Sequence, residues 1–169
     1  MKPEPKPRQR LLAADTTPPH TKQSLRLWLR MLGTTTIIEK KLRSRLKSEW
    51  NTTLPRFDVL AVLDREAAPI TMSQLSDRLL VSNGNVTGLV GRLIEDGHVT
   101  RSVDPANRRT FYVCLTAKGR KAFRAMAAHH ELWIDEMFEN VTDHDMTALL
   151  ALVTEIYHDV HDRMESTKP

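Results

Sequence analysis

Small polar side chains and glycines recur at helical spacing near the middle of this 169-residue chain. Between Ser82 and Asp96 the apolar residues fall on one face of a predicted helix, and the glycines fall on the other. The hydrogen-bonding groups of the segment are Ser82, Asn83, Asn85, Thr87 and Arg92, and its glycines are Gly84, Gly88 and Gly91. Each glycine costs roughly 1 kcal/mol against alanine inside a helix, so a compensation is needed. A bare face would let the helix backbone approach a phosphate or a base edge closely.

Two simpler interpretations of these glycines stay open at the level of the sequence. The segment can be a surface helix of poor propensity, or the glycines can make room for a neighbouring helix. The elements on either side of the segment favour a helix face that approaches a phosphate or a base edge over these two interpretations.

A helix is predicted immediately before the segment. Thr71 and Gln74 stand three residues apart, as in a capping box, which satisfies backbone donors of a first helical turn. Leu75 and Leu79 then recur at helical spacing. Ser82 is a good N-cap, so the next helix can begin after almost no loop. The two helices therefore predict a helix-turn-helix whose second helix reads DNA.

A basic hairpin is predicted directly after the helix-turn-helix. Asp96-Gly97 is a helix stop, and residues 99–103 and 110–115 are β-branched and aromatic runs. The loop between them contains the turn formers Asp104 and Asn107 and carries Arg108 and Arg109 near its tip. Such a loop beside a recognition helix can reach a narrow minor groove of DNA. Taken alone, the arginine pair is equally compatible with a solvated loop.

These runs resemble a known family. The segments SNGNVTGLVGRLIEDGHV, DPANRR and LTAKG stand in the order and spacing of the MarR family of bacterial transcriptional regulators, and the likeness covers nearly the whole chain after residue 24. The resemblance implies a mainly α fold with a small β-hairpin wing, in which a winged helix-turn-helix is flanked by N- and C-terminal dimerisation helices. It also implies that Arg109 enters the minor groove, that Arg108 lies nearer the backbone, and that Asp104 and Asn107 support the wing.

This chain departs from the family pattern at two positions. Gly88 stands where the family often carries an arginine, and Asn107 stands where an aspartate often steadies the wing arginine. Asn107 can still accept a hydrogen bond through its carbonyl, but without the charge of a carboxylate.

Composition and charge bound the class of protein. The chain is 40% hydrophobic and 27% charged, with no run apolar enough to span a bilayer, so we expect a cytoplasmic protein. Its formal net charge is +4. Residues 71–116 hold 5 Lys and Arg against 4 Asp and Glu, and are therefore nearly neutral. Tight binding to DNA would consequently need two copies of the chain and basic residues from the first helix.

The remaining segments suggest a division into four parts. Residues 1–23 are rich in proline and basic residues and predict a disordered arm. Residues 24–52 predict a long helix beginning at Ser24, with apolar residues on more than one side. Residues 53–116 form the DNA-binding lobe, and residues 117–169 predict two further helices with more apolar surface than this lobe could cover. The surplus predicts a homodimer.

The expected partners are a pseudo-palindromic operator in double-stranded DNA, a second copy of the chain and a small-molecule effector. MarR relatives often respond to aromatic carboxylates or their coenzyme A thioesters, and the segments LRLWLRMLGTTTIIEKKLR and TTLPRFDVL are similar to the branch that controls aromatic-acid catabolism. The candidate effector residues are Arg26, Trp28, Arg30, Met31, Arg56, Phe57 and Leu60. The apolar members of this set can equally belong to a dimer core.

Other functions are less favoured by the sequence. The alternative to a ligand-responsive repressor is an architectural or protein-interaction dimer that responds to no ligand. No catalytic motif is present, so we expect no enzyme and no cofactor. His158 and His161 can share a helix face as metal ligands do, but they stand in a polar helix end, and we expect no metal site.

Overall fold

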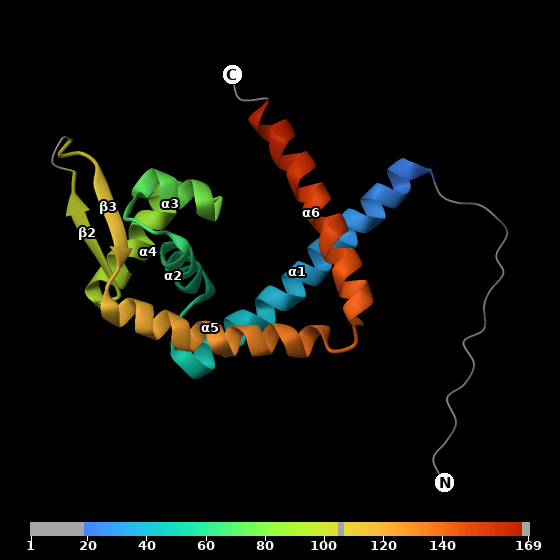
Figure 1. Cartoon of the computed structure of the whole chain (residues 1–169), viewed down its shortest axis with the longest axis horizontal. Helices are drawn as coiled ribbons and strands as arrows, with labels where there is room; N and C mark the ends of the chain where they lie inside the picture. Colours follow the sequence, from blue (N-terminus) through green and yellow to red (C-terminus); the bar gives the residue numbers. More distant parts are fainter. Residues whose placement is uncertain (1–18, 105–106, 167–169) are drawn as a thin grey trace, which may run out of the picture. The chain divides into compact units, whose positions relative to one another are not determined.

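The computed structural model describes residues 19–104 and 107–166 (Figure 1). Most of the predicted arm, residues 1–18, therefore lies outside the described residues. The chain divides into two compact units, residues 1–38 and 39–169. Helix α1 (His20–Trp50) begins in the first unit and ends in the second.

Helix α1 begins four residues before the predicted start at Ser24. The carbonyl of Pro19 accepts hydrogen bonds from the amides of Lys22 and Gln23, which closes the first turn. Ser24 does not cap this turn, because its hydroxyl donates to the carbonyl of His20 from inside the helix. In the first unit most apolar side chains of α1 are exposed, namely Leu25, Leu27, Trp28, Leu29, Leu32 and Ile37, whereas Met31 and Ile38 are half-buried.

The second unit contains five further helices and three strands among the described residues. Their order is α2 (Leu54–Arg65), β1 (Ile70–Thr71), α3 (Met72–Leu79), α4 (Asn83–Glu95), β2 (Val99–Val103), β3 (Phe111–Leu115), α5 (Ala117–Phe138) and α6 (Asp143–Glu165). The predicted fold class is confirmed, since the chain is mainly helical with a small antiparallel sheet. The predicted capping box at Thr71 and Gln74 is present at the start of α3.

The sheet has one strand more than the predicted hairpin. Strand β3 lies between β1 and β2, in the order β1-β3-β2. The hairpin pairs Val99 with Leu115 at one end and Val103 with Phe111 at the other. On the opposite edge Ile70 pairs with Val113. A strand of two residues is too short to show an alternation of apolar and polar side chains in the sequence. Only its pairing with β3 identifies β1 as a strand.

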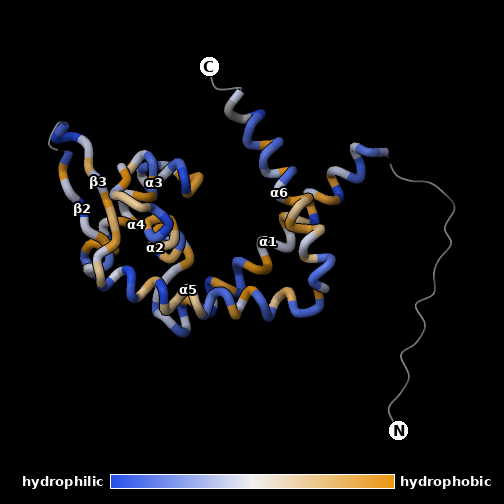
Figure 2. Tube along the Cα trace, in the orientation of Figure 1, coloured by the Kyte–Doolittle hydropathy of each residue, from blue (hydrophilic) through white to orange (hydrophobic). Residues whose placement is uncertain are grey.

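Helix α2 is central to the core of this unit. It contacts α3, α4, α5 and β3, and Val59, Leu60 and Leu63 on it are at most 3% exposed. The other helices that surround it, and the strands, add one or more buried apolar residues each. Helix α6 adds none, and its hydrophobic residues concentrate in the half nearer its start (Figure 2).

The end of α4, the start of β2 and the start of α5 meet at one junction. Gly97 has a φ of +70°, and the amides of Gly97 and His98 donate to the carbonyls of Ile94 and Leu93, as in a Schellman motif. Thr116 caps α5 and also donates its hydroxyl to the carbonyl of Gly97. A Cβ on Gly119 would lie 1.9 Å from the carbonyl oxygen of His98. The first turn of α5 therefore rests directly on the backbone at the start of β2.

Asp58 is a poorly solvated carboxyl group on α2. Burial raises the pKa of Asp58 to about 6; Glu39 on α1 raises it as well, and Arg43 acts in the opposite direction. Arg43 is itself paired with Glu39 at 2.8 Å. Because the folded pKa lies above the unfolded value of 3.8, ionisation of Asp58 opposes folding. The penalty is absent below about pH 4, grows between about pH 4 and pH 6, and is complete above about pH 6.

Replacing Asp58 by asparagine removes this penalty. We expect Asp58→Asn to raise the free energy of unfolding at pH 7.5 by about 1–3 kcal/mol and to change it little at pH 3.5, below the unfolded pKa. Urea denaturation of both proteins at the two pH values measures the difference. Glu49→Gln, at an exposed position of α1, is the matched carboxyl-to-amide control. Equal effects of Asp58→Asn at both pH values would contradict the assignment.

Candidate nucleic-acid interface

Helix α4 has one buried face and one exposed face. Val86, Val90 and Leu93 are at most 3% exposed and hold the helix in the core. The predicted DNA-reading side chains lie on the other side, and all are exposed: Ser82, Asn83, Gly84, Asn85, Thr87, Gly88 and Arg92. The structure thus brings this predicted set together on one surface.

The glycines of α4 border open space. A Cβ built on Gly84, Gly88 or Gly91 would meet no atom within 4 Å. Within the described chain the glycines therefore do not make room for a neighbouring helix, and that interpretation of them falls away. What they produce is a stretch of helix whose backbone is not covered by side chains, as close approach to a ligand requires.

The start of α4 is tied to α3 by a buried serine. Ser76 is 3% exposed, and its hydroxyl donates at 2.8 Å to Oδ1 of Asn83 and lies at the same distance from the carbonyl oxygen of Ser73. Thr87 donates its hydroxyl to the carbonyl of Asn83 at 2.9 Å. Ser82 occupies the N-cap position as predicted, but its side chain makes no capping hydrogen bond. Asn83 is consequently held in place by the preceding helix.

The wing presents its two arginines to solvent. Arg108 and Arg109 are exposed in the loop between β2 and β3, of which residues 105 and 106 lie outside the described residues. Asn107 supports this loop, because its Oδ1 accepts a hydrogen bond from the backbone amide of Arg109 at 3.1 Å. The carbonyl of Asp104 accepts from the amide of Asn107 at 3.2 Å. Both residues predicted to support the wing thus hold its backbone.

Sequence reasoning did not identify two residues that shape this surface. The first is Ser76. It lies beside the apolar stripe of α3, and a polar residue at such a position is a signal that could have identified it. Arg101 on β2 was also missed; its guanidinium lies 5.0 Å from the centre of the Phe111 ring. Arg101 adds a third cation to the wing, and only the strand register reveals that it faces an aromatic ring.

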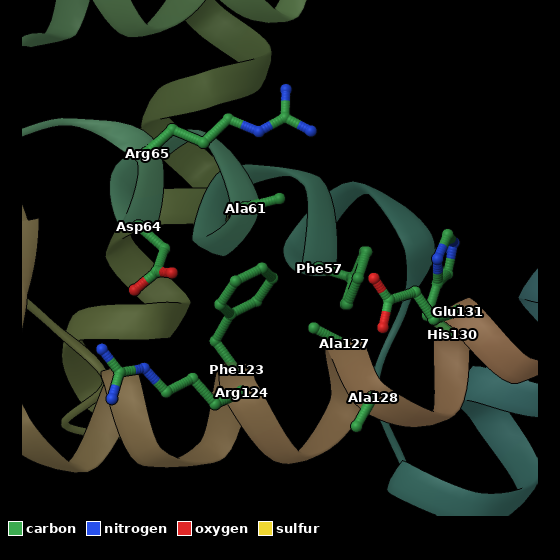
Figure 3. Close-up of a pocket in the computed structure, with 10 residues that line it drawn as sticks. All are labelled: Phe57, Ala61, Asp64, Arg65, Phe123, Arg124, Ala127, Ala128, His130 and Glu131. Carbon is green, nitrogen blue, oxygen red and sulfur yellow. The ribbon is translucent and has the colours of Figure 1, made fainter.

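A groove of about 480 Å³ lies between α2 and α5 (Figure 3). Its lining is Phe57, Ala61, Asp64, Arg65, Phe123, Arg124, Ala127, Ala128, His130 and Glu131. The ring of Phe57 stacks on His130 with 4.8 Å between centres and lies 5.4 Å from that of Phe123. Burial lowers the pKa of His130, so its imidazole is neutral at pH 7. The groove therefore combines aromatic walls with a neutral imidazole, two guanidinium groups and the two carboxylates of Asp64 and Glu131.

The predicted effector residues are only partly at this groove. Phe57 lines it, whereas Leu60 is 1% exposed and belongs to the core. Arg56 forms an ion pair with Asp96. The other four, Arg26, Trp28, Arg30 and Met31, belong to the first unit, where Met31 is half-buried and the rest are exposed. Leu60 thus does not border this groove, and its apolar type alone does not distinguish a pocket wall from a core residue.

The described residues include no group of three His, Cys, Asp or Glu side chains arranged to hold a metal ion. His158 and His161 instead each lie with a ring centre 5.8 Å from that of Tyr157. No described helix combines the length and apolar character needed to cross a membrane.

Comparison with known proteins gives consistent matches. A model described as MarR family matches residues 50–110. A crystal structure of a MarR family transcriptional regulator from Silicibacter pomeroyi has a TM-score of 0.72 and 32% identity, covering 85% of this chain and 99% of that one. The transcriptional activatory protein BadR from Rhodopseudomonas palustris is 34% identical over 104 residues, which are 60% of this chain and 59% of BadR.

A fold likeness also extends to a complex with DNA. The structure of a single-residue mutant of MarR from E. coli complexed with operator DNA has a TM-score of 0.70 and 24% identity, covering 81% of this chain and 97% of that one.

The bare face of α4 leads to a test that separates stability from binding. Gly88→Ala adds a methyl group in open space, so we expect it to raise the free energy of unfolding by roughly 0.5–1 kcal/mol. The same methyl group should weaken binding to duplex DNA, because it holds the helix backbone away from the groove. Chemical denaturation and fluorescence anisotropy measure the two effects. Ser48→Ala, at an exposed position of α1, is the control and should stabilise the protein without changing its affinity for DNA. A Gly88→Ala protein that binds DNA as tightly as the original would rule out a close approach of DNA at Gly88.

Proposed function

This chain belongs to the MarR family of transcriptional regulators, and we propose that it is a homodimeric repressor released from its operator by an aromatic acid or its coenzyme A thioester. As a member of this family it is a DNA-binding transcriptional regulator. One observation carries the proposal most directly: the polar, glycine-bearing face of α4 and the arginines of the wing are exposed on the same compact unit. In this arrangement α4 enters a major groove and the wing follows the neighbouring minor groove.

The exposed apolar surface supports a homodimer. Every side chain of α6 that the structure describes is exposed, including Leu149, Leu150, Leu152, Val153, Ile156, Tyr157 and Val160. The first half of α1 exposes Leu25, Trp28, Leu29 and Leu32 in the same way. A continuous apolar helix face of this kind needs a partner surface, and a second copy of the chain supplies an identical one. Two copies also double the cations available to DNA.

The groove between α2 and α5 is the proposed effector site. Phe57 and Phe123 suit an aromatic ring, and Arg65 or Arg124 suits a carboxylate. Both helices of the groove contact the DNA-binding elements, since α2 packs on α4 and α5 packs on β3. An effector lowers affinity for DNA only if it binds better to a conformation that fits the operator poorly.

The direction of regulation is proposed on the family resemblance alone. BadR, by contrast, is a transcriptional activatory protein. A reporter gene behind the operator, measured with and without the regulator, distinguishes the two directions.

The wing assignment is tested by Arg109→Ala. We expect weaker binding by about the same factor to every duplex sequence. We also expect a shallower dependence of log K on the logarithm of the salt concentration. The slope should fall by about one unit for each phosphate that is no longer neutralised. Anisotropy titrations at several salt concentrations give both quantities, and sedimentation should still show a dimer. Lys121→Ala, an exposed cation on α5, is the matched control. An unchanged affinity and salt slope would exclude Arg109 from the interface with DNA.

The effector assignment is tested by thermal unfolding with a panel of aromatic acids and acyl thioesters. A ligand present at 100 times its Kd should stabilise the native state by about 2.7 kcal/mol and raise the melting temperature. Arg124→Gln should abolish this shift, and Lys121→Gln, outside the groove lining, should retain it. A ligand that stabilises the protein should also release it from DNA. A panel without any effect on melting or on DNA binding would favour the architectural dimer.

A further inference from the structure

The part of α4 that would meet base edges carries no cation. In a docked helix-turn-helix, the N-terminal residues of the recognition helix contact the bases. Here those side chains are Ser82, Asn83, Asn85 and Thr87, all neutral and exposed. Arg92 stands in the last turn of the helix, outside this N-terminal part. Arginine is the usual partner of guanine in the major groove, so the α4 side chains available at base edges are two amides and two hydroxyl-bearing side chains.

The two asparagines differ in what they can offer to a base. Oδ1 of Asn83 accepts the hydroxyl of the buried Ser76, so its amide NH₂ is the group left to face DNA. A donor alone fits N7 of either purine, O6 of guanine or O4 of thymine, and therefore discriminates poorly. Asn83 is in this way a positioning contact.

Asn85 retains both of its hydrogen-bonding groups. Across the described ranges no hydrogen bond or ion pair is made by its carboxamide. One turn further along the helix stands Gly88, around whose Cβ position there is open space, so no neighbouring side chain screens Asn85 on that side. A carboxamide with a free oxygen and a free NH₂ matches the N6 donor and N7 acceptor of adenine in a bidentate contact.

Thr87 independently favours contact with an A·T pair. Its hydroxyl donates to the carbonyl of Asn83 at 2.9 Å, so its single O–H donor is taken, and the methyl group and the acceptor oxygen are what Thr87 can present to DNA. A threonine methyl group makes apolar contact with the C5-methyl group of thymine.

We propose that α4 reads an A·T step in each operator half-site: Asn85 binds adenine through a bidentate contact, and the Thr87 methyl group packs on thymine of a neighbouring pair. This inference rests on the proposed function, since it assumes that α4 occupies a major groove. It adds the class of sequence recognised and the residues that determine it.

Selection of bound sequences from random duplex DNA, using the full chain, tests the proposal. The original protein should select A·T at the pair whose preference depends on Asn85. Asn85→Ala should reduce that preference by about 5- to 150-fold at this pair only, which is the fold-change equivalent of one bidentate contact. Asn85→Arg should shift the preference to guanine. Asn140→Ala, an exposed asparagine between α5 and α6, should select the same sequences as the original.

Two substitutions test Thr87 without removing the whole side chain. Thr87→Ser keeps the hydroxyl and loses the methyl group, so the thymine preference should fall. Thr87→Val keeps a methyl group at this position and should retain the thymine preference. Melting curves confirm that each variant is folded.

The possible failures are distinguishable. If the pair that depends on Asn85 is G·C, or if Asn85→Ala leaves every position unchanged while the original protein still selects a defined operator, the inference is overturned and the proposed function stands. If the folded original protein selects no sequence, the proposed function fails and the inference fails with it.

Discussion

The seating of Val86, Val90 and Leu93 in the core decides which side chains of α4 face solvent. These three residues are spaced at one helical turn, and α4 packs on both α2 and α3. A rotation of α4 about its axis would expose the three apolar side chains and turn Asn85 and Thr87 toward the interior, at a loss of about 1.5–3 kcal/mol for each large apolar residue. The hydrophobic effect, which has no direction of its own, thereby fixes the orientation of a polar surface.

Much of this architecture could be predicted because its signals are local. The capping box at Thr71, the glycine stop at Gly97 and the β-branched runs around the wing each lie within a few residues of the structure that they specify. The elements that escaped prediction depend on distant partners. Strand β1 exists only because β3 pairs with it, and the anchoring of Asn83 requires Ser76 on another helix.

The candidate sites differ in the same way. The DNA-reading residues were predictable as a set because a single helix carries most of them, so that periodicity alone assigns their face. The effector residues come from separate helices, and their types are those that the core also uses. Phe57 and Leu60 are both largely buried and stand three residues apart on α2, yet only Phe57 lines the groove. Which of two apolar neighbours borders a cavity depends on α5, whose position the local sequence around α2 does not specify.

The absence of a side chain at Gly119 couples two parts of the molecule mechanically. The backbone of α5 touches the carbonyl of His98 with no flexible side-chain atoms between them, and Thr116 and Lys118 hydrogen-bond to the carbonyls of Gly97 and Asp96. The root of the hairpin and the first turn of α5 are consequently in direct backbone contact. A shift of this turn of α5 would have to displace the start of β2 as well, because no compliant layer separates the two backbones.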